Sequence, residues 1–312
     1  MNKLKKVGLT ALATTLVASS AYAGEMSVSG SASLNYSGIS TSSDSNPWTM
    51  GDSVTFSGGG DLDNGMTVGV SYELDGGNYD DYKLTLGMGD DLGTITFSGN
   101  SVNAGGVDTV KDMVPTAYTP VYELANEQGG AADNGLATTS GRVTTGMWGY
   151  AVDMSGFAVS LGYNANPAAA AEAEVSIGIK YADLMDGLTV GVGRMDDGDV
   201  AESDTLGVSY SAGSITAAYQ ITKVDYEATG TADQDAHPYG VSVAVNENLS
   251  VSAGRQAVDI DGAADDETNT GISASYTMGS ITIAGAMNAV DSAGGTAAKD
   301  AESTSLNISF AF

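Results

Sequence analysis

Hydrophobic and polar residues alternate with a period of two along most of this chain. In one early stretch, Met26, Val28, Leu34 and Tyr36 share a parity with small residues, whereas Ser or Asn fills the positions between them. A period of two is that of a β-strand, whose successive side chains point to opposite faces of a sheet. The pattern therefore predicts strands with an apolar face and a polar face.

This alternation recurs sixteen times and predicts an all-β fold with an even number of strands. No convincing helix pattern is present, although Pro167-Ala-Ala-Ala-Ala-Glu172 could form a single turn. The predicted strands are 25–37, 53–61, 65–75, 81–89, 93–99, 141–153, 157–164, 173–182, 188–195, 204–211, 214–224, 238–246, 249–258, 269–278, 280–289 and 302–312.

The connections between these strands also alternate, between short turns and mostly longer loops. The short turns are rich in Gly, Asn and Asp, which tolerate the positive φ of hairpin turns. They are 61–65, 89–93, 153–156, 183–187, 212–214, 246–248 and 279–280. The longer connections are 38–52, 76–80, 100–140, 165–172, 195–203, 225–237, 259–268 and 290–301. This asymmetry is typical of an outer-membrane β-barrel, whose short turns are periplasmic and whose long loops are extracellular.

The chain ends inside a strand rather than in a polar tail. Leu306, Ile308, Phe310 and Phe312 share one parity in the last predicted strand. A barrel explains this ending, because its first and last strands must pair to close the sheet. Phe312 is then expected at the periplasmic interface, where aromatic rings are favoured.

Aromatic residues on the apolar parity gather near strand ends, as expected for two interfacial girdles. Those near the outer ends are Tyr36, Tyr72, Tyr82, Tyr163 and Tyr239. Those near the inner ends are Tyr181, Tyr210, Tyr276, Phe310 and Phe312. The ordinary preference of Tyr for strands is the alternative explanation.

The first 23 residues have the pattern of an export signal. Three Lys within the first six residues precede the mostly apolar stretch 7–18, and Ala21-Tyr22-Ala23 is a cleavage pattern. An N-terminal membrane anchor is the alternative, but the apolar stretch is far shorter than the roughly 20 residues that span a bilayer. We expect a signal peptide at 1–23 and one barrel domain at 24–312.

Composition and charge exclude several classes of protein. The chain has 39 Asp and Glu against 11 Lys and Arg, and a formal net charge of −28. This argues against nucleic acid as a partner, because phosphate binding needs clustered cations. The chain has no Cys and therefore no disulfide scaffold. A soluble β-sandwich or secreted β-helix stays open, but neither requires the alternation of short and long connections.

The sequence does not indicate an enzyme. His237 is the only His, so neither a zinc cluster nor a Cys–His pair can form. Gly58-Gly-Gly60 is not followed by the Lys and helix of a phosphate-binding loop, and no Gly-x-Ser-x-Gly pattern is present.

The export signal, sixteen strands, terminal Ser309-Phe-Ala-Phe312 and long fifth connection together resemble a Gram-negative general diffusion porin, most closely the alphaproteobacterial type. The resemblance covers the whole mature chain. It implies a homotrimer of 16-stranded antiparallel barrels in the outer membrane, each with its own water-filled channel. It also implies an inward-folded third loop at about 100–140, and recognition of the last strand, with Phe310 and Phe312 as assembly signal, by the barrel-assembly machinery.

The predicted inward loop is acidic, and Lys111 is the only cation between residues 100 and 140. Its candidate constriction residues are Asp108, Asp112, Glu123, Glu127 and Asp133. The resemblance implies a basic wall opposite this loop, for which the candidates are Lys83, Arg142 and Lys180. Solvated surface positions are the alternative for each of these cations. Three further cations, Arg194, Lys223 and Arg255, have outward parity near the outer rim, where they are expected to meet lipopolysaccharide phosphates.

A cation-preferring channel for small hydrophilic solutes is the expected function, because selectivity follows the diameter and charge of the constriction. A substrate-specific channel and a structural or adhesive surface barrel are the alternatives. No cofactor is required. Asp196, Asp197 and Asp199 could hold a structural Ca²⁺, although solvated surface charge is the favoured explanation.

Overall fold

A computed structural model describes residues 26–42, 46–89, 91–99, 105–128, 130, 146–165, 172–198 and 200–312. The predicted signal peptide lies outside these residues, as do Asp133, Arg142, Asp199 and all but the last residue of the single turn expected at 167–172. None of the helices in the described part of the chain is long and apolar enough to cross a membrane.

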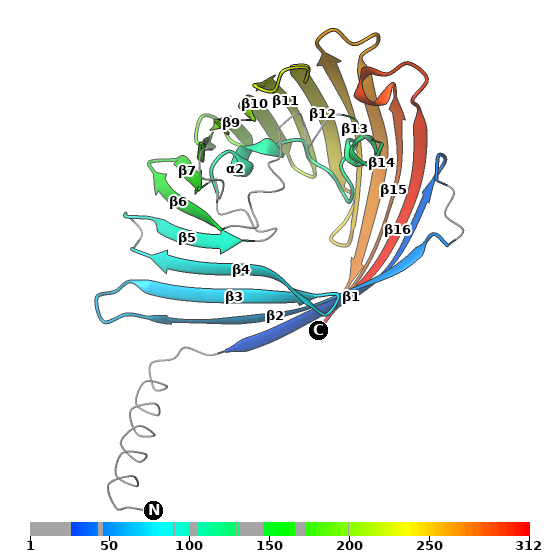
Figure 1. Cartoon of the computed structure of the whole chain (residues 1–312). Helices are drawn as coiled ribbons and strands as arrows, with labels where there is room; N and C mark the ends of the chain where they lie inside the picture. Colours follow the sequence, from blue (N-terminus) through cyan, green and yellow to red (C-terminus); the bar gives the residue numbers. More distant parts are fainter. Residues whose placement is uncertain are drawn as a thin grey trace, which may run out of the picture.

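Sixteen antiparallel strands form one closed barrel, which confirms the predicted fold (Figure 1). The strands are β1 (Ser27–Ile39), β2 (Trp48–Asp61), β3 (Thr67–Asp75), β4 (Asn78–Gly87), β5 (Thr94–Gly99), β6 (Met147–Met154), β7 (Phe157–Asn164), β8 (Glu174–Tyr181), β9 (Leu188–Asp196), β10 (Ala201–Ala212), β11 (Ile215–Tyr226), β12 (Gln234–Ala244), β13 (Leu249–Ile260), β14 (Glu267–Met278), β15 (Ile281–Asp291) and β16 (Ala301–Ala311).

The first and last strands close the barrel as the terminal pattern predicts. β1 pairs with β16 in a register that sets Leu34 beside Ile308. At the end of the chain the Gly30 N–H donates to the Phe312 carbonyl at 2.8 Å, and the Phe312 N–H donates to the Gly30 carbonyl at 2.9 Å. The ring of Phe312 covers Gly30, where a Cβ would lie 2.5 Å from Phe312 Cε2. No strand edge remains open at this seam, which a barrel in lipid requires.

The period of two separates an outer apolar face from an inner polar face. Val70, Leu84 and Ile272 are 50%, 52% and 57% exposed on the outer face. Their large exposed apolar area has the character of a surface that meets lipid. Short turns close the opposite end from the long loops. Ser155 and Gly156, for example, adopt φ of 51° and 86°, the positive values that tight hairpins need.

Several element bounds differ from the prediction. β2 begins at Trp48 rather than at 53, and β12 begins at Gln234 and contains Pro238. Ladder pairing between β11 and β12 is interrupted around Pro238, because Pro has no N–H to donate. Two helical turns, α2 (Asp108–Lys111) and α3 (Glu123–Glu127), and a 3₁₀ turn, η3 (Ala293–Gly295), were not predicted. All three are too short to show a helical period.

Candidate functional site

The inner face of the barrel is covered on one side and open on the other. Inward-facing Ser160, Gln220 and Asn269 are 5%, 0% and 0% exposed, whereas inward-facing Ser29 and Ser31 of β1 are exposed. The covering segment is 105–128, which lies inside the barrel against β7–β15 (Figure 1). The predicted inward fold of this loop is therefore confirmed over these residues, and the lumen lies between the loop and β1–β4.

Glycines on the inner face make room for the loop. Gly191 of β9 and Gly207 of β10 lie side by side, and a Cβ at either position would be 2.5 Å from Met113 Sδ. Val110 packs on Gly193 in the same way. A second row, Gly240, Gly254 and Gly271 on β12–β14, faces Val114 and Val121. Apolar loop side chains thus sit in troughs that larger wall residues would fill.

Side chains of the wall also bind the loop backbone. Gln220 accepts a hydrogen bond from the Met113 N–H at 3.1 Å and donates one to the Lys111 carbonyl at 2.6 Å. Asn288 donates to the Pro120 carbonyl at 3.2 Å. Further bonds from the wall are Gly106 N–H to Ser160 Oγ at 2.8 Å, Ala117 N–H to Ser252 Oγ at 2.8 Å and Tyr118 N–H to Ser273 Oγ at 3.1 Å.

The far end of the loop packs into a small core at the long-loop end of the barrel. Leu124 and Ala125 of α3 form a buried cluster with Val290, Ala293 and Ala301. A hydrogen bond from Thr41 Oγ1 to Gln128 Oε1, at 2.9 Å, joins the loop to the connection between β1 and β2. The segment is therefore fixed at both ends as well as along its length.

Four of the predicted constriction carboxylates lie on this segment. Asp112, Glu123 and Glu127 are exposed, and the Asp108 side chain is 32% exposed. Lys111 Nζ lies 2.8 Å from Asp108 Oδ1 and 4.0 Å from Asp112 Oδ2. Tyr122 donates a hydrogen bond to Asp112 Oδ1 at 3.0 Å. The segment therefore presents more negative than positive charge to the space inside the barrel.

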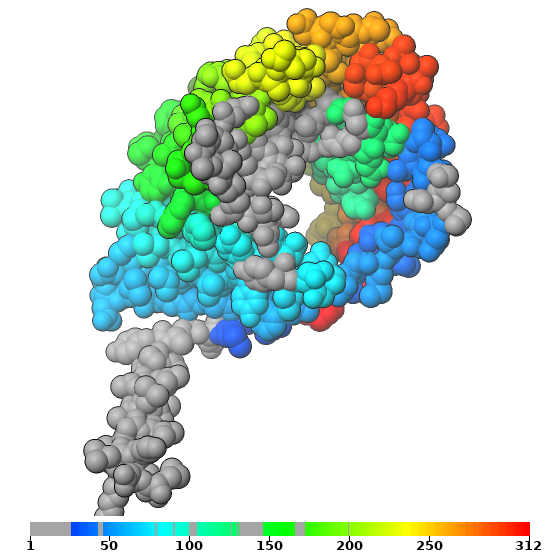
Figure 2. Space-filling view, viewed as in Figure 1, coloured from blue at the N-terminus to red at the C-terminus, as the bar shows by residue number. Residues whose placement is uncertain are grey.

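The open wall carries hydroxyl groups, which were not predicted as part of the site. Figure 2 shows an opening through the barrel, with the green loop segment at its upper right and cyan and light-blue strand residues along its lower edge. The Ser31 and Ser53 hydroxyls lie 3.0 Å apart on β1 and β2, and Asn307 of β16 donates to Asn35 at 2.5 Å. The inward row of β1 consists of Ser27, Ser29, Ser31, Ser33, Asn35 and Ser37. This unbroken polar row is the signal that could have located the open wall.

The two described candidates for a basic wall lie in different places. Lys83 of β4 is exposed on the inward row between Ser71 and Ser98, so it belongs to the open wall. Lys180 of β8 lines a hollow of about 720 Å³ together with Thr109 of α2. It therefore lies on the wall that carries the loop. The structure does not bring these two lysines together into one cluster.

Comparison with known proteins identifies the family of this barrel. The sequence pattern of the family described as Gram-negative porin matches residues 8–312. The chain belongs to the Gram-negative porin family. It is thus an outer-membrane porin channel, and this membership indicates a channel rather than an enzyme. A search of curated proteins found no match.

Solved porin structures share the fold at low sequence identity. A porin refined at 1.8 Å resolution is 18% identical, with 92% of this chain and 100% of that chain covered and a TM-score of 0.69. A mutant of the Rh. blastica porin is 15% identical, with the same coverage and a TM-score of 0.65. The anion-selective porin from Comamonas acidovorans is 16% identical, with 93% and 100% covered and a TM-score of 0.64. These similarities show the fold alone.

The outer-rim cations of this porin face outward, as their parity predicts. Arg194 shares the outward row of β9 with Val192, and its guanidinium lies 2.5 Å from Glu202 Oε2 and 3.0 Å from Asp204 Oδ2. Lys223 Nζ lies 2.7 Å from Asp235 Oδ2. These two cations are therefore paired on the outer surface rather than directed into the pore. Their contact with lipopolysaccharide stays a prediction.

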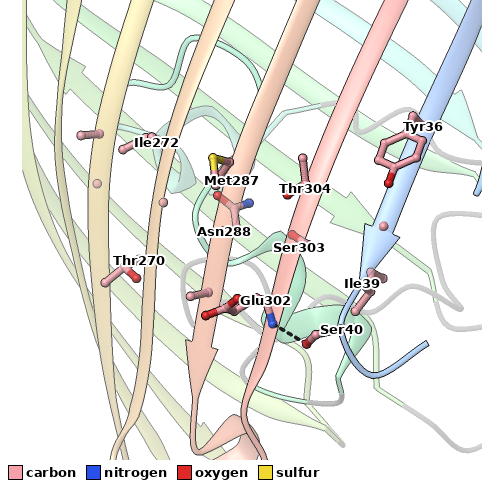
Figure 3. A pocket seen from close by; sticks show the side chains of 15 residues that line it. Tyr36, Ile39, Ser40, Thr270, Ile272, Met287, Asn288, Glu302, Ser303 and Thr304 are labelled. Atoms are coloured by element: carbon pink, nitrogen blue, oxygen red, sulfur yellow. Dashed lines mark hydrogen bonds between the residues drawn. The ribbon is translucent and has the colours of Figure 1, made fainter. Parts of the chain in front are cut away.

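A hollow on the outer surface has mainly apolar side chains along the strands and polar side chains nearer the long loops (Figure 3). It measures about 780 Å³, and its lining includes Tyr36, Ile272, Met287 and Thr304. Nearer the loops, the Glu302 N–H donates to Ser40 Oγ at 2.9 Å.

The predicted calcium site stays a prediction. Asp196 is exposed and accepts a hydrogen bond from the Gly198 N–H at 2.9 Å, whereas Asp197 is buried. No group of three or more His, Asp or Glu in the described ranges could hold a metal ion. Asp199 lies outside those ranges.

Proposed function

We propose that this porin is a water-filled channel for passive diffusion of small hydrophilic solutes, and that it prefers cations. The supporting observation is the exposure of Asp112, Glu123 and Glu127 on a loop that is folded into the barrel. Lys111 is the single cation between residues 105 and 128, and its ammonium already lies beside Asp108.

The physical basis of the preference is electrostatic. A sixteen-stranded barrel encloses an aqueous lumen, and its low-dielectric wall concentrates the field of charges inside it. Carboxylates at the narrowest part raise the local concentration of cations. Salt screens this field over about 10 Å at 0.1 M, so the preference should weaken as the salt concentration rises.

The similarity to an anion-selective porin carries no argument on selectivity. Selectivity depends on the few side chains at the constriction, and a relative of 16% identity shows the fold alone. The opposite wall of this chain offers hydroxyl groups and Lys83, together with Glu73 and Asp75 on the inward row of β3, so these residues give it no net positive charge against the acidic loop.

We further propose that three copies associate in the outer membrane, as the resemblance of the sequence to general porins implies. Insertion into a planar bilayer should then raise the conductance in groups of three equal steps. Insertion in single, independent steps would contradict a trimer. Folded protein that conducts no current would favour the adhesive-surface alternative over a porin channel.

The test of the cation preference is the reversal potential across a planar bilayer under a KCl gradient. We expect the unmodified porin to favour K⁺, and the ratio of K⁺ to Cl⁻ permeability to fall toward one when four loop carboxylates are neutralised. The variant carries Asp108→Asn, Asp112→Asn, Glu123→Gln and Glu127→Gln. A matched control neutralises four exposed carboxylates at the short-turn end: Asp61→Asn, Asp63→Asn, Asp186→Asn and Glu247→Gln. An equal loss in both variants would contradict the loop as the source of selectivity.

A further inference from the structure

Gln220 lies on the inner wall directly beneath the inward loop. It follows Gly191 and Gly207 in one row of paired positions across β9, β10 and β11. The two glycines only leave room for the Met113 side chain, whereas Gln220 offers both a hydrogen-bond donor and an acceptor. Its side chain is fully buried beneath the loop.

The Gln220 amide binds the loop backbone on both sides of Asp112. Its oxygen accepts from the Met113 N–H at 3.1 Å, and its nitrogen donates to the Lys111 carbonyl at 2.6 Å. The same nitrogen donates to Thr222 Oγ1 at 3.0 Å, which fixes the direction of the amide. A primary amide can make all three bonds at once. Gln220 thus acts toward residues 111–113 as a neighbouring strand would.

These bonds fix the place of a charged side chain. Asp112 stands between the two residues that Gln220 holds, and Tyr122 donates to its carboxylate at 3.0 Å. Met113 is held below by the glycine pair. The backbone of residue 112 therefore has little freedom, and its carboxylate stays on the exposed face of the loop.

We propose that Gln220 is a positioning residue for ion selectivity, which it controls by holding Asp112 in the constriction. This inference rests on the proposed cation preference. An apolar side chain of similar size would fill the space but remove a buried donor and a buried acceptor from the loop. The loss of these bonds weakens the attachment of residues 111–113 to the wall, so these residues can move away from it.

The first test is a double-mutant cycle on the reversal potential. Gln220→Met should lower the K⁺ to Cl⁻ permeability ratio by about twofold or more, because a displaced carboxylate contributes less field at the constriction. In an Asp112→Asn background the same change should have no further effect. An unchanged ratio in a folded Gln220→Met barrel, or an equal loss in both backgrounds, would overturn the proposal.

A matched control and a second readout separate this inference from the proposed function. Gln234→Met removes an inward-facing amide from the neighbouring strand, β12. The oxygen of the Gln234 amide has no hydrogen-bond partner in the described part of the chain. It should leave selectivity unchanged. Because the chain has no Cys, Asp112→Cys can carry a single spin label. Gln220→Met should increase the mobility of that label.

The label reports position without reference to ion preference. If the unmodified porin showed no cation preference, the proposed function would fail, and the mobility of the label alone would decide whether Gln220 holds residue 112. An immobile label in Gln220→Met would overturn the positioning role.

Discussion

Glu267 is a buried carboxylate that joins three segments of the chain. It is 0% exposed at the start of β14. Its Oε1 accepts from Asn269 Nδ2 at 2.7 Å, and its Oε2 accepts from the Gly294 N–H of η3 at 2.9 Å. Gly130, beyond α3, lies against the same oxygen, where a Cβ would clash. The wall, one outer connection and the end of the inward loop therefore meet at this side chain.

Replacement of this carboxylate should destabilise the barrel. Glu267→Gln places an NH₂ group against an N–H donor, either that of Asn269 or that of Gly294, so a buried hydrogen bond is lost. The expected reduction in the free energy of unfolding is about 1–3 kcal/mol, measured by urea unfolding in lipid vesicles. Glu247→Gln, in an exposed short turn, should change it far less. Equal effects of the two substitutions would show that the Glu267 contacts contribute little.

Residue identity in the sequence revealed charge but not these supporting contacts. The acidic residues 108, 112, 123 and 127 could be selected because they crowd one long loop with a single cation before residue 129. Gln220 and Glu267 could not, because each is one polar residue among many on alternating strands. Their roles depend on which loop atoms approach them, and no spacing along the chain encodes that approach.

At the scale of elements, the inward loop depends on glycines in the strands beneath it. Gly207 lies on β10 between Gly191 and Gln220, and its missing side chain leaves room for Met113. Glycine normally weakens a strand interior, so its recurrence on the inner face has a packing reason here.

Gly207→Val should push the loop into the lumen and lower the single-channel conductance. The added Cβ would lie 2.5 Å from Met113 Sδ, closer than nonbonded atoms allow, and the wall behind it is fixed by the barrel ladder. Gly58→Val is the matched control on the outer face, where a Cβ would lie 3.9 Å from Val70 Cγ1. If both variants conducted as the unmodified porin does, the trough would not set the place of the loop.

Strands could be predicted from the sequence because burial on one face imposes a period of two over many residues. Their ends were less predictable. β12 runs through Pro238, which usually marks a strand boundary, because the barrel tolerates a short interruption of the β11–β12 ladder there. α2 and α3 span four and five residues, so tertiary contacts rather than a helical pattern determine them.

At the scale of the whole molecule, the closure of the barrel and the asymmetry of its lumen have different origins. Closure follows from the terminal strand, whose pattern predicted its pairing with β1. The asymmetry of the lumen follows from the path of residues 105–128, which cover β7–β15 and leave β1–β4 open (Figure 1). Periodicity alone treats both halves of the inner face alike; only the unbroken Ser and Asn row of β1 indicates which half the water reaches.

Thiol accessibility measured through the channel current tests this account most directly. Three single-Cys variants of a chain without native Cys compare the open wall, the loop and the covered wall: Ser31→Cys, Asp112→Cys and Ser203→Cys. A charged methanethiosulfonate reagent should react rapidly at the exposed positions 31 and 112 and reduce the current. It should react far more slowly at position 203, which is 1% exposed beneath the loop. Equal reactivity at positions 203 and 31 would contradict a pore that runs between the inward loop and the serine-lined wall.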